Sequence, residues 1–407
     1  MVSCLLLRLS LLNILCECSS KMASTRSSSP RVVCLLVLSE KKLSALSELD
    51  DAEGASADGV RYVRCTRSLT PESLAQLGAS STEHLVVLHK AGYDCVVREV
   101  DEAAAARWQL LAGLPSASLF EPLDAAVRLA DRYEVCCALD RLAPHVRQPR
   151  FVKLLGGRAE VLGSVSGLTF PLICKPCVAC GPGGHRLALI RREEGLHSFL
   201  QSCSSSTVGE CAVNNGGTSC SAGDSSHLAS PWIAQEFINH GAVIIKAYAI
   251  GDFYHVAVRP SLPDILSTSL SGGSGLEPAM ETFDSQQPYT ATAAAIQDSG
   301  YHAEATSQRM PTQDAQELQG SLGYAKTMQT IKERRGEIEH VVATVKSHMG
   351  LEVIGVDFVV GSTGDLLIVD VNHFSGAPKS VPGFKQALSH AIARSKRSMG
   401  GTVDVDM

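Results

Sequence analysis

Residues 355–372 constrain the fold of this chain most, because they read as two apolar strands joined by a tight turn. The turn is Ser-Thr-Gly-Asp at residues 362–365, and its glycine tolerates the positive φ that such a turn needs. The next four residues are Leu-Leu-Ile-Val, which are apolar enough for a buried strand. The segment therefore predicts a β-hairpin whose second strand lies in a core.

Three oxygen-bearing side chains lie on this hairpin. Asp357 is in its first strand, while Asp370 and Asn372 are two residues apart in its second and so share a face of the sheet. Acidic residues beside apolar strands are usually solvated, but carboxylates on a buried strand need a compensating partner. Two carboxylates and a carboxamide suit Mg²⁺, which takes its other ligands from water and substrate phosphates. The hairpin thus indicates nucleotide-dependent phosphoryl chemistry.

The length and net charge of the chain limit the classes of partner that it can bind. The chain has 407 residues, enough for two or three domains, and a formal charge of −6 with acidic and basic residues mixed. No broad basic face for nucleic acid is evident, so we expect no nucleic-acid partner and a local cluster of cations for any anionic ligand. The 14 cysteines are scattered. Cys174, Cys177 and Cys180 lack a nearby fourth ligand, which favours reduced core thiols over a metal site.

The first 30 residues leave two interpretations open. Residues 5–15 are leucine-rich but too short and interrupted to span a membrane. They have some character of a signal peptide, whereas the polar stretch from Met22 resembles an ordinary N-terminus after an upstream start. We expect residues 1–30 to be disordered or targeting-like, and a cytoplasmic protein with no membrane partner.

Strands and helices alternate over residues 31–115, which predicts a small N-terminal α/β domain. Its expected elements are strands at residues 31–38, 62–65 and 85–89 and a helix at 40–49. Residues 116–390 form the second predicted domain. It is expected to contain strands at 172–176, 187–190, 232–238, 242–250 and 254–258, an amphipathic helix at 124–142 and a long helix at about 325–348.

Two stretches lack apolar periodicity. Residues 202–230 and 267–321 are rich in Ser, Gly, Ala, Gln and Thr, which is typical of flexible insertions. Residues 391–407 are expected to form a loose tail.

Two lysines interrupt apolar strands. Lys175 and Lys246 each lie within a run of aliphatic residues, where a charge is costly unless it faces a cleft or an anion. The Gly-Pro-Gly-Gly sequence at 181–184 could fold over phosphates, although such a sequence is more often a simple turn and matches neither common phosphate-loop motif. His185 and His240 lie beside these strands; a lone histidine is more often structural. Two lysines in separate apolar strands and a hard-cation site together indicate a cleft that neutralises a triphosphate.

The ordered set of motifs resembles the inositol-tetrakisphosphate 1-kinase (inositol 1,3,4-trisphosphate 5/6-kinase) family of the ATP-grasp superfamily. Its most diagnostic pieces are Gln-Glu-Phe-Ile-Asn-His-Gly at 235–241 and Arg-Pro-Ser-Leu-Pro at 259–263. The other matching segments are at residues 38–43, 88–90, 119–132, 175–185 and 370–374. The resemblance implies an α/β (α+β) chain with an ATP-grasp fold, a small N-terminal α/β (pre-ATP-grasp) domain and a nucleotide cleft between two antiparallel sheets.

The resemblance also implies an activity and residue roles. The expected enzyme is an ATP- and Mg²⁺-dependent phosphotransferase that moves the γ-phosphoryl group to a hydroxyl of an inositol polyphosphate, working as a monomer. The residues implied at the nucleotide are Arg132, Lys175, Gln235, Glu236, Ile238, Lys246, Ser261 and Ser285. Those implied at the metal are Asp357, Asp370 and Asn372. Those implied at the inositol phosphate are Lys42, Lys90, His185, Lys246, Asn372 and Gly376.

Catalysis is expected to rest on Lys246, His185 and Asp370. No carboxylate is poised as a general base, and loose phosphoryl transfer needs little base assistance, so no general base is assigned. His185 is a secondary candidate for the proton acceptor. The family usually has Asn-x-Phe-Pro-Gly after the metal strand, whereas this chain has serine in place of the proline at 375, which loosens one φ angle and could change which inositol positions fit. Two alternatives stay open: an ATP-grasp carboxylate–amine ligase, and a nucleotide-binding protein without turnover.

Overall fold

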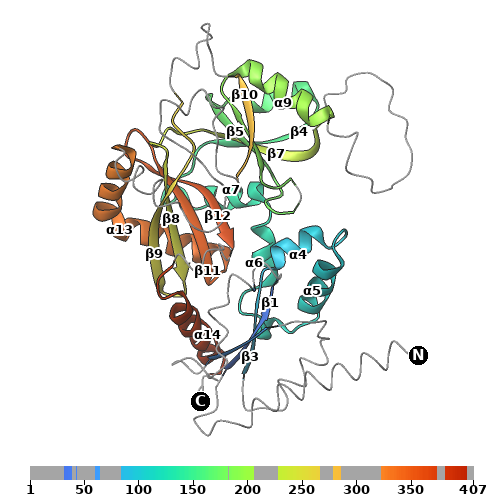
Figure 1. Cartoon of the computed structure of the whole chain (residues 1–407), viewed down its shortest axis with the longest axis vertical. Helices are drawn as coiled ribbons and strands as arrows, with labels where there is room; N and C mark the ends of the chain where they lie inside the picture. Colours follow the sequence, from blue (N-terminus) through green and yellow to red (C-terminus); the bar gives the residue numbers. More distant parts are fainter. Residues whose placement is uncertain are drawn as a thin grey trace, which may run out of the picture.

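The chain folds into three tiers of secondary structure stacked along its long axis (Figure 1). The computed structural model describes residues 32–38, 43, 60–64, 84–181, 183–205, 228–265, 278–285, 322–373 and 381–400. Each tier contains one sheet, of three, four and five strands. None of the described helices combines the length and the apolar character needed to cross a membrane.

The lowest tier is the predicted N-terminal α/β unit. Its parallel sheet has the strand order β2-β1-β3, formed by β1 (Val32–Val37), β2 (Val60–Arg64) and β3 (His84–His89). The helices that follow it are α4 (Ala91–Val97), α5 (Glu102–Ala112), η2 (Ser116–Ser118) and α6 (Leu123–Arg128). The three predicted strands are confirmed. Of the helix expected at 40–49, only Leu43 is among the described residues, and it is helical.

Both faces of this sheet are buried, as is usual for parallel strands. Side chains alternate along β1: Leu35 and Val37 pack with residues of α5, whereas Cys34 and Leu36 pack with α14 (Phe384–Gly400). The C-terminal helix therefore completes the core of the N-terminal sheet.

The middle tier carries the predicted hairpin. Its antiparallel sheet has the order β12-β11-β8-β9, formed by β8 (Val243–Ile250), β9 (Phe253–Pro260), β11 (Val353–Val360) and β12 (Leu366–His373). Residues of α7 (Arg132–Asp140) and α13 (Leu322–Met349) share its apolar core. Every residue of β11 is buried, and Gly364 in the hairpin turn has a φ of 85°, as expected from its sequence.

The upper tier is a five-stranded antiparallel sheet in the order β10-β6-β5-β7-β4. Its strands are β4 (Phe151–Gly156), β5 (Leu172–Pro176), β6 (Arg186–Ile190), β7 (Leu228–Glu236) and β10 (Met280–Asp284). Residues of α8 (Arg158–Val165) and α9 (Glu193–Ser205) pack in the core of this tier. Residues 237–242 then lead from β7 directly into β8, so a short hinge joins the two antiparallel sheets.

The single helix predicted at 124–142 is wrong: the structure has α6 and α7 with a break between them. Asp131 has an extended backbone, with φ −108° and ψ 112°, and its carboxylate accepts hydrogen bonds from the backbone nitrogens of Tyr133 at 2.8 Å and Glu134 at 3.3 Å. Such an N-cap starts a new helix. The break makes Arg132 the first residue of α7.

Three predicted boundaries also move. Strand β10 lies inside the stretch expected to be an insertion at 267–321, and α9 and β7 extend into the one expected at 202–230. Helix α14 continues past the predicted domain end at 390, and Ala391 and Ile392 are buried. A five-residue edge strand inside a Ser/Gly-rich stretch gives almost no periodic signal. The apolar face of α14 is buried only because it packs against the N-terminal sheet, which is distant in the sequence.

Candidate active site

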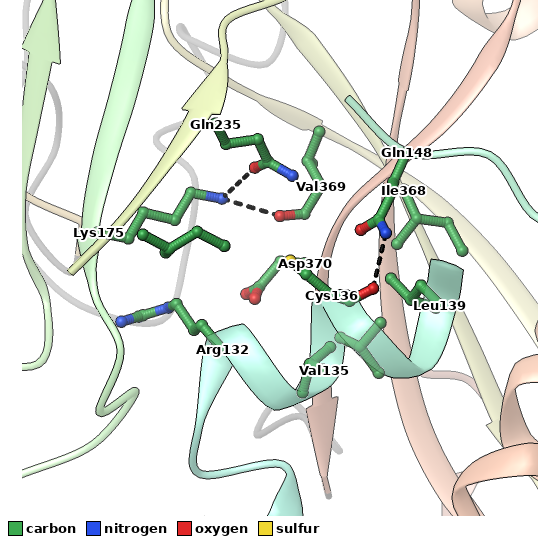
Figure 2. A pocket seen from close by; sticks show the side chains of 12 residues that line it. Arg132, Val135, Cys136, Leu139, Gln148, Lys175, Gln235, Ile368, Val369 and Asp370 are labelled. Carbon is green, nitrogen blue, oxygen red and sulfur yellow. Dashed lines mark hydrogen bonds between the residues drawn. The ribbon is translucent and has the colours of Figure 1, made fainter. Parts of the chain in front are cut away.

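A pocket lies between the two antiparallel sheets, where β5 and β7 of one approach β12 of the other over the start of α7 (Figure 2). Its polar lining includes Arg132, Lys175, Gln235 and Asp370. The predicted cleft between two antiparallel sheets is therefore present, and it brings together residues from four separate elements.

The centre of the site is a row of charges across three neighbouring strands. Lys246 on β8 is opposite Asp357 on β11, which is opposite Asp370 on β12. Directly opposed residues share a face of the sheet, with Cβ atoms about 4.5–5.5 Å apart. Lys246 Nζ lies 3.0 Å from Asp357 Oδ2. Lys175 is coupled electrostatically to both carboxylates, so the two lysines and the hairpin belong to one site, as predicted.

Burial and neighbouring charges shape the ionisation of this row. Burial lowers the pKa of Lys246, but the carboxylates of Asp357 and Asp370 outweigh it, so the pKa is raised and the ammonium stays charged. Burial also raises the pKa of Asp357, and the like charge of Asp370 adds to this effect against the opposing effect of Lys246. These two adjacent carboxylates, of which Asp357 is buried, thus carry more negative charge than Lys246 alone neutralises.

The same residues fit a magnesium ion. Asp357 Oδ1 is buried and has no hydrogen-bond partner among the described residues, which is costly for a carboxylate oxygen. Asn372 Nδ2 donates to Asp370 Oδ2 at 2.8 Å, so the donor side of the amide is used and its oxygen remains an acceptor. No described group of three or more His, Cys, Asp or Glu could hold a metal, so a cation here would draw on two carboxylates, one carboxamide, phosphates and water.

At the pocket, the two sheets are connected through a bulge in β12. Asp357 pairs with Asp370 but Phe358 pairs with Ile368, so Val369 is an extra residue in the ladder. Lys175 Nζ donates to the Val369 carbonyl at 2.9 Å and to Gln235 Oε1 at 3.0 Å (Figure 2). Burial lowers the pKa of Lys175 against the opposing charge of Asp370. Bulges frequently re-aim groups next to active sites, and this one was not visible in the sequence.

Arg132 holds the glycine-rich segment against α7. Its Nη1 donates to the carbonyls of Pro176 at 2.8 Å and Gly184 at 3.0 Å. Its Nε is buried without a partner among the described residues, which leaves one charged donor at the pocket wall. Gly181 and Gly183 have φ values of 82° and 78°, so this loop needs glycine for its path.

His185 follows this loop and links it to β10 and to the N-terminal tier. The backbone nitrogen of Ser285 donates to the His185 carbonyl at 2.9 Å, and Ser285 Oγ lies 3.5 Å from His185 Nδ1. Burial, Arg132 and Lys90 lower the pKa of His185, so its imidazole is neutral at pH 7. Lys90 is therefore within electrostatic reach of the site. Lys42 and Gly376, also expected at the acceptor, lie outside the described residues.

Of the residues expected at the nucleotide base, Gln235 has its side chain in the pocket and Glu236 does not. Gln235 is 2% exposed and points to Lys175, inside the pocket. The Glu236 carboxylate instead accepts from the Thr169 backbone nitrogen at 2.7 Å and pairs with Arg150. Its side chain is therefore not brought to the pocket, because successive residues of β7 face opposite sides.

A hydrogen-bond relay fixes the hinge. Burial lowers the pKa of His240, so the ring is neutral. Its Nδ1 lies 2.6 Å from the Ile238 carbonyl, which can only accept, so Nδ1 carries the proton. Nε2 must then accept the hydroxyl proton of Ser261 at 2.8 Å. The Ser261 oxygen keeps its own lone pairs for another donor.

Asp264 braces the same hinge. Its Oδ1 accepts from the backbone nitrogens of His240 at 2.7 Å and Gly241 at 2.8 Å. Sequence reasoning missed Asp264 and treated His240 as a lone histidine. The available signal was that His240 lies within one diagnostic motif and Asp264 directly follows the other, but their partnership depends on the return of the chain after β9.

Comparisons with known proteins give the same family that the motifs resemble. A family model described as the inositol 1,3,4-trisphosphate 5/6-kinase ATP-grasp domain matches residues 223–394. The chain is 22% identical over 371 residues to an inositol-tetrakisphosphate 1-kinase of Xenopus laevis, covering 87% of this chain and 76% of that protein. It is 27% identical over 298 residues to inositol-tetrakisphosphate 1-kinase 6 of Oryza sativa subsp. indica, covering 69% of this chain and 44% of that protein.

Among solved structures, a D-alanine–D-alanine ligase from Bacillus anthracis aligns with a TM-score of 0.49 and 13% identity, covering 90% of this chain and 98% of that one. The ADP complex of purK, an N5-carboxyaminoimidazole ribonucleotide synthetase, aligns with a TM-score of 0.44 and 10% identity, covering 90% and 78%. The family match over residues 223–394, together with the two antiparallel sheets and the motifs they carry, shows that this part of the chain is similar to the inositol 1,3,4-trisphosphate 5/6-kinase ATP-grasp domain.

Proposed function

We propose that this protein is an ATP- and Mg²⁺-dependent kinase that phosphorylates a hydroxyl of an inositol polyphosphate. The observation that carries the proposal is the row of Lys246, Asp357 and Asp370 across three strands, with Lys175 electrostatically coupled to both carboxylates. Catalysis of phosphoryl transfer is mostly positioning and charge neutralisation, and this row supplies cationic and cation-binding groups in one place.

The metal-binding groups are proposed to be Asp357, Asp370 and Asn372. A bound Mg²⁺ would neutralise phosphate charge and orient the transferred group. Around it, Lys175 and the Nε of Arg132 would bind phosphate oxygens from the side of the upper sheet. Lys246, which stays charged, would stabilise the negative charge between donor and acceptor.

The base and ribose of ATP are proposed to lie along the hinge. Gln235 presents its side chain to the pocket, and Ile238 offers its backbone nitrogen while its carbonyl is bonded to His240. Ser261 is held by the His240 relay with its lone pairs available. Glu236 would contribute through its backbone, because its carboxylate is bonded elsewhere.

A polyphosphorylated acceptor is supported by cations that arrive from more than one tier. Lys90 comes from the end of β3, His185 from the loop before β6 and Lys246 from β8. Lys42 and Gly376 remain proposed acceptor contacts. His185, whose lowered pKa leaves it neutral, can take the hydroxyl proton of the acceptor.

The arrangement gives less support to a carboxylate–amine ligase. That reaction calls for an arginine free to bind a carboxylate deep in the metal cleft. Among the described residues that line the pocket, Arg132 is the sole arginine, and its Nη1 is bonded to the carbonyls of the glycine-rich loop.

The test is a paired assay. Purified protein with Mg²⁺ and γ-labelled ATP is offered a panel of inositol tris- and tetrakisphosphates, and in parallel a panel of carboxylic acids with amines. Label should move to an inositol phosphate and to nothing in the second panel. Phosphate release with acid and amine alone would establish the ligase instead, and ATP binding without turnover in either panel would establish a binding protein.

A further inference from the structure

A buried polar cluster joins the lower tier to the middle tier, the two sheets drawn with β3 and β12 in Figure 1. It consists of His89, Glu121 and His373, whose exposed fractions are 1%, 2% and 7%. His89 directly precedes Lys90, and His373 directly follows Asn372. Each histidine is thus one residue from a proposed acceptor contact.

Glu121 is the centre of this cluster. Its Oε1 accepts from the backbone nitrogens of Glu352 at 2.8 Å and Val353 at 2.7 Å, where β11 begins. Its Oε2 lies 2.5 Å from His373 Nε2, at the end of β12. A carboxylate can only accept, so the histidine nitrogen is the donor. One side chain therefore ties the start of β11 to the end of β12.

The backbone of Glu121 makes the third connection. Its carbonyl accepts from His89 Nε2 at 2.8 Å, and His89 Nδ1 in turn accepts from the Ala91 nitrogen at 3.4 Å. Both ring nitrogens are used, which fixes the orientation of His89 at the end of β3. The same residue thus connects the strand before Lys90 with the strand that carries Asn372.

Packing alone does not explain this choice of residue. A buried carboxylate costs several kcal/mol in desolvation, and well-packed apolar residues often serve stability equally well. The neighbouring Phe120 shows the apolar alternative, since it is 6% exposed within the core shared with the N-terminal sheet. Unlike apolar packing, the hydrogen bonds of this cluster are directional, so they fix the relative positions of three strand ends.

We infer that Glu121 is a positioning residue for the phosphorylated acceptor, setting Lys90 against Asn372 at the separation that one polyphosphate bridges. The inference rests on the proposed kinase function and deepens it. Small displacements of binding groups are expensive, because an error of about 1 Å can cost roughly 100-fold in rate. The proposed nucleotide contacts Lys175 and Gln235 lie on the upper sheet, and Ser261 is bonded to His240 of the hinge, so Glu121 should affect acceptor and ATP unequally.

The experiment compares Glu121→Gln and Glu121→Asp with Phe120→Leu, a packing control in the same core. For Glu121→Gln we expect the KM for the acceptor to rise about 10- to 100-fold, as for other residues that orient a binding group, while the ATP dissociation constant changes less than about twofold. Aspartate keeps the charge and should recover part of the loss. Phe120→Leu should lower the Tm without separating the two ligands.

A readout independent of turnover completes the test. Calorimetric binding of inositol hexakisphosphate, used as a polyphosphate probe, should weaken in Glu121→Gln while Mg²⁺–ATP binding persists. Equal loss for both ligands, or an equal acceptor effect in Phe120→Leu, would overturn the positioning role. Absence of inositol phosphate turnover in the wild-type protein would overturn the kinase function itself. If the wild-type protein still binds inositol hexakisphosphate in that case, the effect of Glu121→Gln on that binding still tests the positioning role. Failure of the wild-type protein to bind the probe would overturn both.

Discussion

Lys246 and Asp357 face each other on adjacent strands, with Nζ 3.0 Å from Oδ2, in a setting where the lysine is 20% and the aspartate 10% exposed. The second oxygen of Asp357 is buried without a partner among the described residues, and Asp370 stands on its other side. Lys246 therefore does not fully neutralise the negative charge of Asp357 and Asp370. A divalent cation and phosphates would complete the neutralisation.

Asp370→Asn should reduce phosphoryl transfer by about 100-fold or more, comparable to the loss of one group that stabilises transition-state charge. The substitution keeps the shape of the side chain but removes the negative charge that would hold Mg²⁺. Turnover and the Mg²⁺ concentration giving half-maximal rate are the measurements. The matched control is Asp124→Asn on α6, whose side chain is 75% exposed, and wild-type rates in Asp370→Asn would contradict the metal assignment.

Lys246→Met should destabilise the fold by about 3–5 kcal/mol near pH 7.5, because it leaves Asp357 as a buried charge without its partner. Burial already raises the pKa of Asp357, and loss of the lysine raises it further. A raised folded-state pKa means that the native state holds its proton longer than the unfolded chain, so stability is lost as pH rises above the ordinary value.

The deficit of Lys246→Met relative to wild type should therefore shrink as the pH falls, because protonated Asp357 carries no charge to desolvate. Urea unfolding at several pH values measures this. Lys332→Met removes an exposed lysine of α13 and should show no such pH dependence. A deficit that stays constant from pH 7.5 to 5 would refute the coupling.

Ser261→Ala should weaken ATP binding and lower stability by about 1–3 kcal/mol, since it leaves the Nε2 acceptor of buried His240 without a donor. Calorimetry with Mg²⁺–ATP and thermal unfolding give the two readouts. Ser198→Ala on α9, which removes an exposed hydroxyl, is the control and should change neither. An unchanged ATP affinity would place the nucleotide away from this part of the hinge.

Acid should destabilise the protein through His89. Burial lowers the pKa of His89 from 6.5 to about 4, so the unfolded chain binds a proton before the native state does. Stability from this residue is complete above the unfolded pKa and is lost as the pH falls below it, by about 2 kcal/mol between pH 7 and pH 5.

His89→Gln should flatten that part of the stability profile, measured by urea unfolding across the same range. The exposed His348 offers the control His348→Gln, which should leave the slope unchanged. A slope that is equally steep in His89→Gln and wild type would show that other groups cause the acid sensitivity.

Several parts of this fold follow from short stretches of sequence. Apolar runs and turn residues predict the strands, and a glycine flanked by polar residues predicts the hairpin turn at Gly364. The shared face of Asp370 and Asn372 follows from the two-residue period of a strand. A lysine in an apolar strand signals a cleft because desolvation makes any other location costly. These inferences succeed because each depends on residues a few positions apart.

The tertiary structure alone decided how these pieces meet. The bond from Lys175 to the Val369 carbonyl joins residues 194 positions apart, and that from His373 to Glu121 joins residues 252 positions apart. No local pattern encodes the bulge that exposes that carbonyl, the break that turns Arg132 into the start of a helix, or the strand ends that Glu121 holds together. Side-chain chemistry was readable from the sequence, but its geometry arises from register and packing between distant segments, which is settled only when the three sheets assemble.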